Sequence, residues 1–209
     1  MNKKFISIII GSVLVIGVSS NAQNLKFGLL GGIDLVNIYM TPLEPRQIGQ
    51  PYGNMRAFNI NCFISYKNQR FWGFSIEPGF IQKGGSQGVQ QRCRLELNYF
   101  QIPILADVYI LQKLYLSIGP EFSYMISAKF INVDPDFTNS VYSNYKDKIE
   151  LSGLIGIKYM ITQRIDLGLR YNHGISPLIK VPLFGYNHVI LGKAKMYNQY
   201  FQINVGFHF

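Results

Sequence analysis

Hydrophobic and polar residues alternate strictly from Leu114 to Phe130, LYLSIGPEFSYMISAKF. This pattern predicts a β-strand with one apolar and one polar face. A soluble strand usually has about 5–6 residues, whereas a tilted strand that crosses a bilayer takes roughly 9–11 plus some overhang. Both charged residues, Glu121 and Lys129, fall on the polar face among small residues. We therefore predict that the apolar face meets lipid and the polar face lines a lumen.

The same alternation recurs along the rest of the chain. We predict eight strands, at Leu25 to Tyr39, Arg56 to Tyr66, Phe71 to Lys83, Arg94 to Ile110, Leu114 to Phe130, Lys148 to Tyr159, Ile165 to Gly174 and Met196 to Phe209. Short turns alternate with four long loops, at Met40 to Met55, Gly84 to Cys93, Ile131 to Asp147 and Ile175 to Lys195. This predicts an all-β fold: an eight-stranded, antiparallel, up-and-down transmembrane β-barrel with short periplasmic turns and long extracellular loops. Closing the sheet removes the unpaired strand edges that lipid does not tolerate.

Two predicted strands contain irregular positions. Pro78 cannot donate a ladder hydrogen bond, so we expect either a local bulge or a missing bond there. In Arg94 to Ile110 the apolar positions change phase between Tyr99 and Phe100. A phase change of this kind predicts a β-bulge in that strand.

Composition agrees with a membrane barrel. Charged residues make up 15% of the chain and aromatic residues 14%, and the charged share is well below the roughly 25% of soluble domains. The net charge of +9 does not indicate nucleic-acid binding, because the basic residues are scattered and form no clustered footprint. Attraction to anionic lipid headgroups is a milder use of the same charge.

The N-terminus predicts a cleaved signal peptide, residues 1–22, before a barrel domain at residues 23–209. A short basic region precedes an apolar stretch from Phe5 to Val18, and Ser20-Asn21-Ala22 supplies the small residues that a signal peptidase reads. The alternative is a membrane anchor, but the apolar stretch is shorter than the roughly 18–20 residues of a spanning helix. We expect the two cysteines, Cys62 and Cys93, to be free, because they lie near opposite ends of the predicted barrel.

Several segments resemble the PorT-like outer-membrane β-barrel family of the Bacteroidetes. They are FGLLGGIDLVN from Phe27, FSIEPGFIQKGG from Phe74, LNYFQIPIL from Leu97, LSIGPEFSYMISAK from Leu116 and LGLRYNHG from Leu167. The resemblance implies a barrel and an outer-membrane location. Its namesake is tied to type IX secretion, but the motifs match barrel architecture, so the resemblance supplies no catalytic or binding residues. The chain ends in aromatic Phe209, as substrates of the outer-membrane barrel insertion machinery do, which makes that machinery an expected partner.

An eight-stranded barrel is narrow and its side chains fill it, whereas a wide aqueous channel needs roughly 16 strands. Counted from the short turns, Glu77, Glu121 and Arg170 fall at similar heights. We predict a lumenal ion-pair cluster with Arg170 between the two carboxylates, because buried charges must pair. Asp107, Lys158 and Asp166 are expected to form a second layer near the periplasmic end. The functional alternative, paired carboxylates acting as acid and base, lacks substrate access in a filled lumen.

The main rival is a small barrel enzyme that acts on outer-membrane lipids. The three histidines, His173, His188 and His208, are not grouped with a Ser and an acid, and G-x-S-x-G is absent. No cysteine and histidine spacing predicts a zinc site. We therefore expect no enzyme activity, cofactor or metal. Converging Ser, His and acid at the upper rim would favour the enzyme, and clustered loop aromatics would favour binding.

We predict a structural or interaction role in the outer membrane, through the loops or with an envelope partner. The expected contacts are outer-membrane lipid, a protein partner on the long loops and no nucleic acid. An interfacial aromatic girdle is expected at the turn side, formed by Tyr66, Phe71, Trp72, Tyr159, Phe207 and Phe209. A third alternative is a soluble periplasmic barrel holding an apolar ligand, which would need the opposite arrangement of faces.

Overall fold

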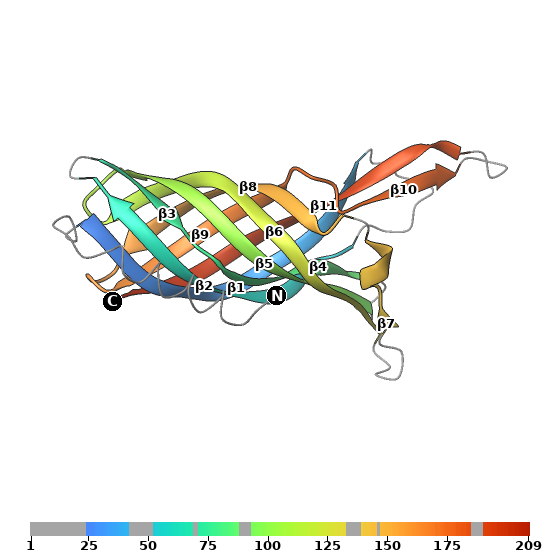
Figure 1. Cartoon of the computed structure of the whole chain (residues 1–209), viewed down its shortest axis with the longest axis horizontal. Coiled ribbons are helices and arrows are strands. Elements are labelled where there is room, and N and C mark those ends of the chain that lie inside the picture. The colour runs from blue at the N-terminus through green and yellow to red at the C-terminus, as the bar shows by residue number, and fades with distance from the viewer. Residues whose placement is uncertain are drawn as a thin grey trace, which may run out of the picture.

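The computed structural model describes residues 24–41, 52–68, 71–87, 93–132, 139–145, 147–184 and 190–209. The predicted signal peptide, His188 and parts of the long loops lie outside these ranges. Within them the chain forms an elongated barrel (Figure 1). Its strands are β1 (Leu25–Thr41), β2 (Met55–Lys67), β3 (Trp72–Ile76), β4 (Gly79–Gln87), β5 (Cys93–Tyr109), β6 (Leu114–Asn132), β7 (Asn139–Ser140), β8 (Ile149–Met160), β9 (Ile165–Gly174), β10 (Ile179–Phe184) and β11 (Ile190–His208).

The barrel wall is a closed antiparallel ring of eight strands, as predicted. Each wall strand pairs with its neighbours in chain order, and β3 and β4 together serve as one strand. The first and last strands close the ring, with pairs from Gly28 and His208 to Thr41 and Lys195. The short connections lie at one end with the C-terminus, here called the turn end, and the opposite end is called the loop end (Figure 1).

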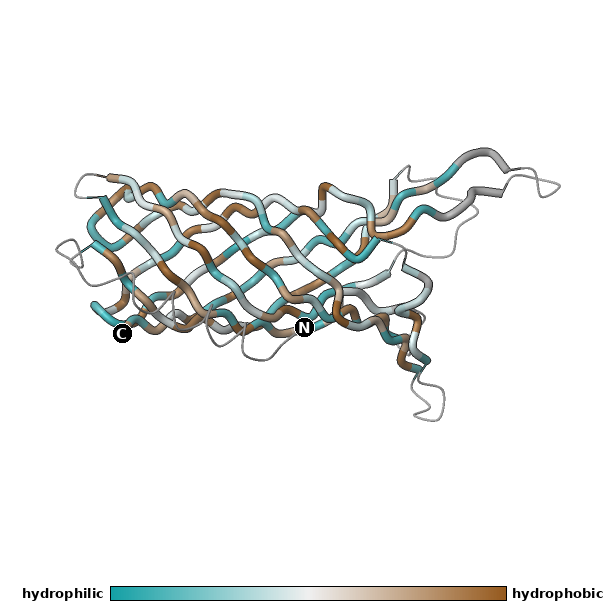
Figure 2. The backbone as a smooth tube through the Cα atoms, in the orientation of Figure 1, coloured by the Kyte–Doolittle hydropathy of each residue, from teal (hydrophilic) through white to brown (hydrophobic). Residues whose placement is uncertain are grey.

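The outer face of the wall is apolar. Along β11 the exposed outward positions include Phe201, Ile203, Val205 and Phe207, while the alternate positions are buried. Figure 2 shows this alternation as hydrophobic and hydrophilic residues following one another along the strands. The outward positions from Tyr197 to Phe207, which are apolar or aromatic except for Gln199, extend roughly 33 Å, or roughly 23 Å of height at a tilt of about 45°. Transmembrane barrels carry an apolar band about 25 Å tall, so the wall has the dimensions of a bilayer span.

Pro78 interrupts the third wall strand without shifting its register. Pairing on both sides of the interruption keeps the same alignment with β2 and with β5. Cys62 N still donates to Pro78 O at 2.9 Å, and Glu77 N donates to Pro103 O at 3.0 Å. Of the two expectations for Pro78, the missing ladder bond is therefore correct and the bulge is wrong.

The predicted bulge near Tyr99 lies in the neighbouring strand. Asn98 faces Ser127 and Tyr99 faces Met125, so Ile126 of β6 is the extra residue. Residues of β5 keep alternating through this point: Leu95, Leu97 and Tyr99 are buried, and Phe100 is exposed. The apolar positions of β5 change from inward to outward because its first part carries apolar residues that point into the lumen. The prediction of a bulge in β5 is therefore wrong.

Because of this extra residue, the end of β6 turns its side chains to the opposite faces from those predicted. Strict alternation holds up to Ile126, which is exposed. Beyond it the phase changes, and Ala128, predicted to face lipid, is fully buried. A bulge adds one residue on one strand and turns the following side chains to the other face.

The longest predicted loop, Ile175 to Lys195, is largely a β-hairpin. Strand β10 pairs with the first part of β11, which begins at Ile190 instead of Met196. This hairpin projects past the barrel at the loop end, and β7 lies at the same end of the molecule (Figure 1). The short 3-10 helix η4 (Tyr142–Asn144) follows β7. The wall strands therefore continue well beyond the membrane-spanning band.

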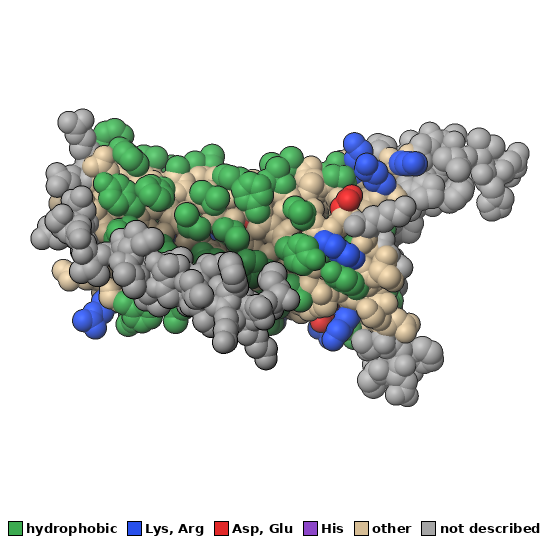
Figure 3. Space-filling view, in the orientation of Figure 1, with side chains coloured by type: hydrophobic (Ala, Val, Ile, Leu, Met, Phe, Trp, Pro, Cys, Tyr) green, Lys and Arg blue, Asp and Glu red, His purple; other side chains and the backbone are tan. Residues whose placement is uncertain are grey.

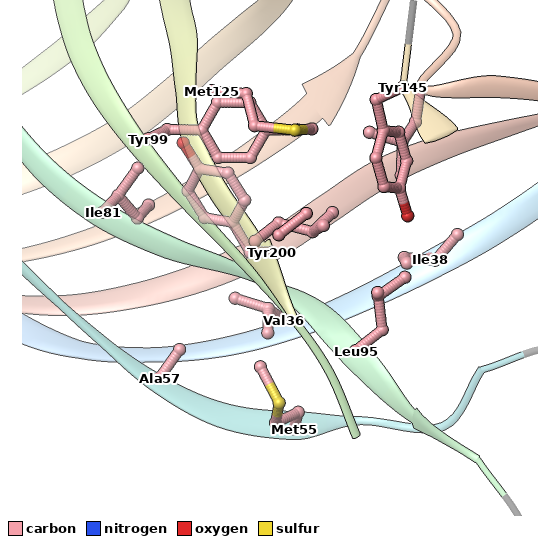
Figure 4. Packing of buried hydrophobic residues seen from close by; sticks show 13 residues of the cluster. Val36, Ile38, Met55, Ala57, Ile81, Leu95, Tyr99, Met125, Tyr145 and Tyr200 are labelled. Atoms are coloured by element: carbon pink, nitrogen blue, oxygen red, sulfur yellow. The ribbon is translucent and has the colours of Figure 1, made fainter. Parts of the chain in front are cut away.

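Buried apolar side chains gather in the loop-side part of the lumen, and Figure 4 shows them from close by. We call this set the apolar plug. It contains Val36, Ile38, Met55, Ala57, Ile81, Leu95, Leu97, Tyr99, Met125, Ala128, Tyr145, Leu178 and Tyr200. In β4, Gly84 has φ 126°, and a Cβ there would lie 1.9 Å from Leu95 O. Only glycine lets β4 and β5 approach this closely beside the plug.

Both cysteines are free, as predicted. Cys62 is exposed on the outward face, and Cys93 is half-buried at the start of β5. Among the described residues, no helix is long and apolar enough to cross a membrane.

Candidate functional site

Glu77 lies at the centre of an ion cluster in the turn-side lumen. Arg170 donates two hydrogen bonds to it, at 2.6 and 2.8 Å. Lys158 Nζ donates to Glu77 Oε1 at 2.9 Å. All three side chains are buried. The bidentate geometry is the strongest form of this pair, and the sequence correctly placed these three residues in the lumen.

Lys83 forms a second ion cluster, nearer the loop end. Its Nζ donates to Glu121 and Glu150, both at 2.9 Å, and to Ser123 at 3.1 Å. Tyr200 donates to the other oxygen of Glu121 at 2.5 Å. Lys83 is fully buried. One cation therefore serves two carboxylates in the interior of the barrel.

The predicted position of Arg170 between Glu77 and Glu121 is wrong. Glu121 pairs with Lys83, and only Glu77 pairs with Arg170. Counting residues from the short turns misjudges height, because the strands of a closed barrel are tilted and staggered against each other. Lys83 also reaches its partners through a long flexible side chain, so the height of its ammonium group cannot be predicted from its position along the strand.

The predicted second layer is split among different partners. Lys158 joins Glu77, whereas Asp107 accepts a hydrogen bond from Ser117. Asp166 pairs with His208, with 2.5 Å between Asp166 Oδ2 and His208 Nε2. All of these groups are buried toward the turn end, as expected, but they do not form one cluster.

A cavity of about 810 Å³ opens at the turn end. The Asp166–His208 pair lines it, and so do Lys26, Lys113 and Arg164. Gly206 makes room for the pair, since a Cβ there would lie 2.5 Å from Asp166 Oδ2. Among the described residues, Asp166 Oδ1 and His208 Nδ1 have no hydrogen-bond partner. We call this cavity the vestibule.

A further set of buried polar side chains, from β1, β2, β5 and β11, forms hydrogen bonds in the lumen. Asn59 Nδ2 donates to Asp34 at 2.8 Å and to Asn204 at 2.9 Å. Gln101 donates to Asn61 at 3.0 Å. Sequence reasoning missed Asp34 and Lys83 as cluster members, although their positions on the polar face were the available signal.

A histidine and three tyrosines form an aromatic group on the outer surface near the loop end. Tyr39 and Tyr171 hydroxyls contact the two ring nitrogens of His173, at 2.7 and 3.0 Å. Tyr39 stacks on both His173 and Tyr197, with ring centroids 4.8 and 5.1 Å apart. We call these four residues the outer aromatic patch. At this rim the described partners of His173 are tyrosines, which is not the Ser and acid arrangement that would favour an enzyme.

Other aromatic residues gather on top of the apolar plug. Tyr52 and Tyr142 pack against it, and Tyr145 is buried within it. Burial raises the pKa of Tyr145 above its ordinary value, and Tyr52 adds to the effect. Lys148 lies 3.5 Å from the centre of the Tyr142 ring. The loop aromatics therefore cluster in an ordered cap, the arrangement that favours binding.

The predicted girdle residues lie at the turn end. Phe71, Trp72, Tyr159, Phe207 and Phe209 are exposed, and Tyr66 is half-buried. Tyr66 lies 6.4 Å from Trp72 between ring centroids, and Phe207 lies 5.6 Å from Phe209. Their interfacial role stays a prediction.

Charged and apolar side chains both occupy the described lumen. Two buried ion clusters and the apolar plug occupy successive levels of it. Within the described part of the chain, no group of three or more His, Cys, Asp or Glu side chains is placed to hold a metal ion.

Residues 21–180 match the family model described as outer membrane protein beta-barrel domain. The chain belongs to this family. It is an outer-membrane protein.

Among solved structures, it is similar to Ail, the attachment invasion locus protein of Yersinia pestis, with TM-score 0.51, 13% identity, and 89% of this chain and 99% of that chain covered. Neisserial surface protein A is similar at TM-score 0.53 and 13% identity, with 88% and 97% covered. At these identities the likeness shows the fold alone. No curated protein matches the sequence.

Proposed function

We propose that this protein is a non-catalytic barrel that anchors a binding surface at the loop end, acting alone or within an envelope complex. The observation that carries the proposal is the contrast between a filled lumen and an elaborated loop end. Lys83 and its two carboxylates occupy the lumen beneath the apolar plug. The β10–β11 hairpin and the aromatic cap extend beyond it. Function concentrates in loops that a rigid scaffold holds.

Membership of the PorT-like branch is part of the same proposal. The sequence segments that resemble this branch form wall strands here, including the β4 residues around Gly84 and the β6 residues around Glu121. These are scaffold positions. They support a shared barrel architecture, and the proposed binding surface for a partner lies elsewhere, at the loop end.

The experiment compares the two ends of the barrel. In one variant Asn-Gly joins Pro182 to Lys193, which face each other in the hairpin, and residues 183–192 are removed. Asn-Gly suits a two-residue hairpin. In the control, Asn-Gly replaces Thr162 and Gln163 in a turn at the other end. Cross-linking in intact cells is expected to give protein adducts that the hairpin variant loses and the control keeps. Identical adducts in all three proteins, or none in the wild type, would contradict the proposal.

A closed lumen also predicts electrical behaviour. Wild-type protein in planar bilayers is expected to give no steady open channel, because the buried Lys83 cluster and the apolar plug occupy the described lumen. A stable conductance in the wild type would show that the lumen opens and that the barrel is a pore.

The rival enzyme has one observation in its favour. The Asp166–His208 pair lines the vestibule, and so do Ser65 and Ser75. No hydrogen bond is recorded between His208 and either serine, and both are described residues. Vesicles of phospholipid and lipid A are expected to release no fatty acid above a heat-denatured control. Release that His208→Ala abolishes would establish the enzyme instead.

A further inference from the structure

Three lysines stand together on the outward face of the β10–β11 hairpin. Lys193 and Lys195 are two residues apart on β11, and both are exposed, with fully buried Ala194 between them. Lys180 of β10 is also exposed and lies directly opposite Lys195. We call these residues the lysine triad. In Figure 3, Lys and Arg side chains, with Asp or Glu side chains among them, lie at the loop-side edge of the hydrophobic band.

Among the described residues, the side chains of the lysine triad form no ion pair and no hydrogen bond. Like charges directly opposite each other destabilise a strand pair. Lys180 and Lys195 therefore form an arrangement that a bound anion would stabilise.

The outward face of β11 changes character in a fixed order along the strand. Lys193 and Lys195 come first, Tyr197 of the outer aromatic patch and the polar Gln199 follow, and an aliphatic and aromatic stretch runs from Phe201 to Phe207. Aromatic rings with polar tips favour the boundary between hydrocarbon and headgroups. The order basic, aromatic, aliphatic is the order that a lipid meets from its headgroup to its acyl chain.

The heights agree with this order. Successive outward residues are roughly 7 Å apart along a strand, or roughly 5 Å in height at a tilt of about 45°. With Tyr197 at the hydrocarbon boundary, Lys195 stands about 5 Å and Lys193 about 10 Å above it. The headgroup region on each side of a bilayer is roughly 5–8 Å thick. Both ammonium groups therefore reach the level of headgroup phosphates through flexible stems.

We infer that the lysine triad, with the outer aromatic patch beneath it, binds the phosphate groups of an anionic lipid in the outer leaflet. Tyr39 and Tyr197 stack against each other and give the sugar or acyl boundary of the lipid a flat surface. His173 holds Tyr39 and Tyr171 through its two ring nitrogens. This lipid site is separate from the loop-end partner proposed above, and either can fail without the other.

The test uses phosphorylated lipid A as the probe. Nanodiscs of phosphatidylcholine are doped with phosphorylated lipid A or with its dephosphorylated form, and bound lipids are counted by native mass spectrometry. The triad variant is Lys180→Gln, Lys193→Gln and Lys195→Gln. Each lysine near an anionic surface strengthens binding roughly fivefold, so the triad variant is expected to bind the phosphorylated probe about 100-fold more weakly. The wild type is expected to prefer the phosphorylated form.

A matched control removes the same charge at the other end. Its changes are Lys26→Gln, Lys113→Gln and Arg164→Gln, which all line the vestibule. This control is expected to bind the probe like the wild type, and both variants should keep the gel-mobility shift on boiling that marks a folded barrel. Equal losses in both variants would overturn the site in favour of general electrostatic attraction. Equal binding of the two lipid forms, or tight binding of soluble heparin that excludes the probe, would also overturn it.

Discussion

The loop-side part of the lumen is filled by apolar side chains, whereas the rest holds two ion clusters, other hydrogen-bonded polar side chains and the vestibule. Lys83 lies at the border, with its ammonium 4.8 Å from the Tyr99 ring centre and 5.3 Å from that of Tyr200. Below it, Glu77 is held by Arg170 and Lys158. The two regions are held together by different interactions. The packing of the apolar plug depends on shape and buried area, and the ion clusters depend on each charge keeping its partner.

The largest expected effect comes from removing the single cation at the border. Lys83→Met leaves Glu121 and Glu150 buried without a counter-charge, and breaking a buried pair in this way costs about 3–5 kcal/mol of unfolding free energy. Denaturant unfolding in detergent micelles measures the loss. Arg170→Met is the matched comparison, and its loss should be smaller because Glu77 keeps Lys158.

A triple variant sharpens this result. Adding Glu121→Gln and Glu150→Gln to Lys83→Met removes the stranded charges and is expected to restore part of the loss. If Lys83→Met unfolds at the same denaturant concentration as the wild type, the two carboxylates do not depend on Lys83.

An intermediate effect is expected in the apolar plug. Leu97 is fully buried, and Leu97→Ala removes apolar contacts and leaves a cavity, at a cost of about 2–4 kcal/mol. Leu169→Ala is the control, since Leu169 is 52% exposed on the outward face and its loss leaves no enclosed cavity. Thermal unfolding in the same detergent compares them. Equal destabilisation would mean that the plug is not tightly packed.

The smallest effect on stability is expected at the bulge of β6. Asn98 Nδ2 donates to Ser127 Oγ at 2.9 Å beside the extra residue of β6. Asn98→Ala removes a half-buried neutral hydrogen bond, which contributes about 0.5–1.5 kcal/mol. Ser127→Ala should give a similar loss, and the double variant should lose little more than either single one. Additive losses would show that the two side chains act independently.

The contrast between the two regions also explains what sequence could predict. Where the lumen is charged, Glu121 and its neighbours alternate with lipid-facing residues, so strands and faces follow from the period of two. Where the lumen is apolar, Leu97 and Phe100 are both hydrophobic although they face opposite ways. Inward and outward residues then no longer differ in hydropathy. The sequence prediction therefore mistook apolar residues that face the lumen for a shift in which residues face lipid.

Side-chain partners were harder to predict than faces. Glu77, Arg170 and Lys158 were placed in the lumen correctly, but the partner of Glu121 was missed. Pairing depends on the stagger between strands and on side-chain reach, and neither is encoded in the spacing along one strand. The hairpin of β10 and β11 was missed for a different reason, because Lys180, Lys193 and Lys195 place polar residues where a lipid-facing strand would have apolar ones.

The seam between β1 and β11 joins the first strand of the barrel to the last. No shorter length of chain can close the ring, so every partly assembled form has two open strand edges beside a hydrophobic outer face. Such edges readily pair with other chains, and pairing between distant segments is slow. Until Phe207 and His208 reach Leu29 and Gly28, these edges are therefore open to pairing with other copies of the chain.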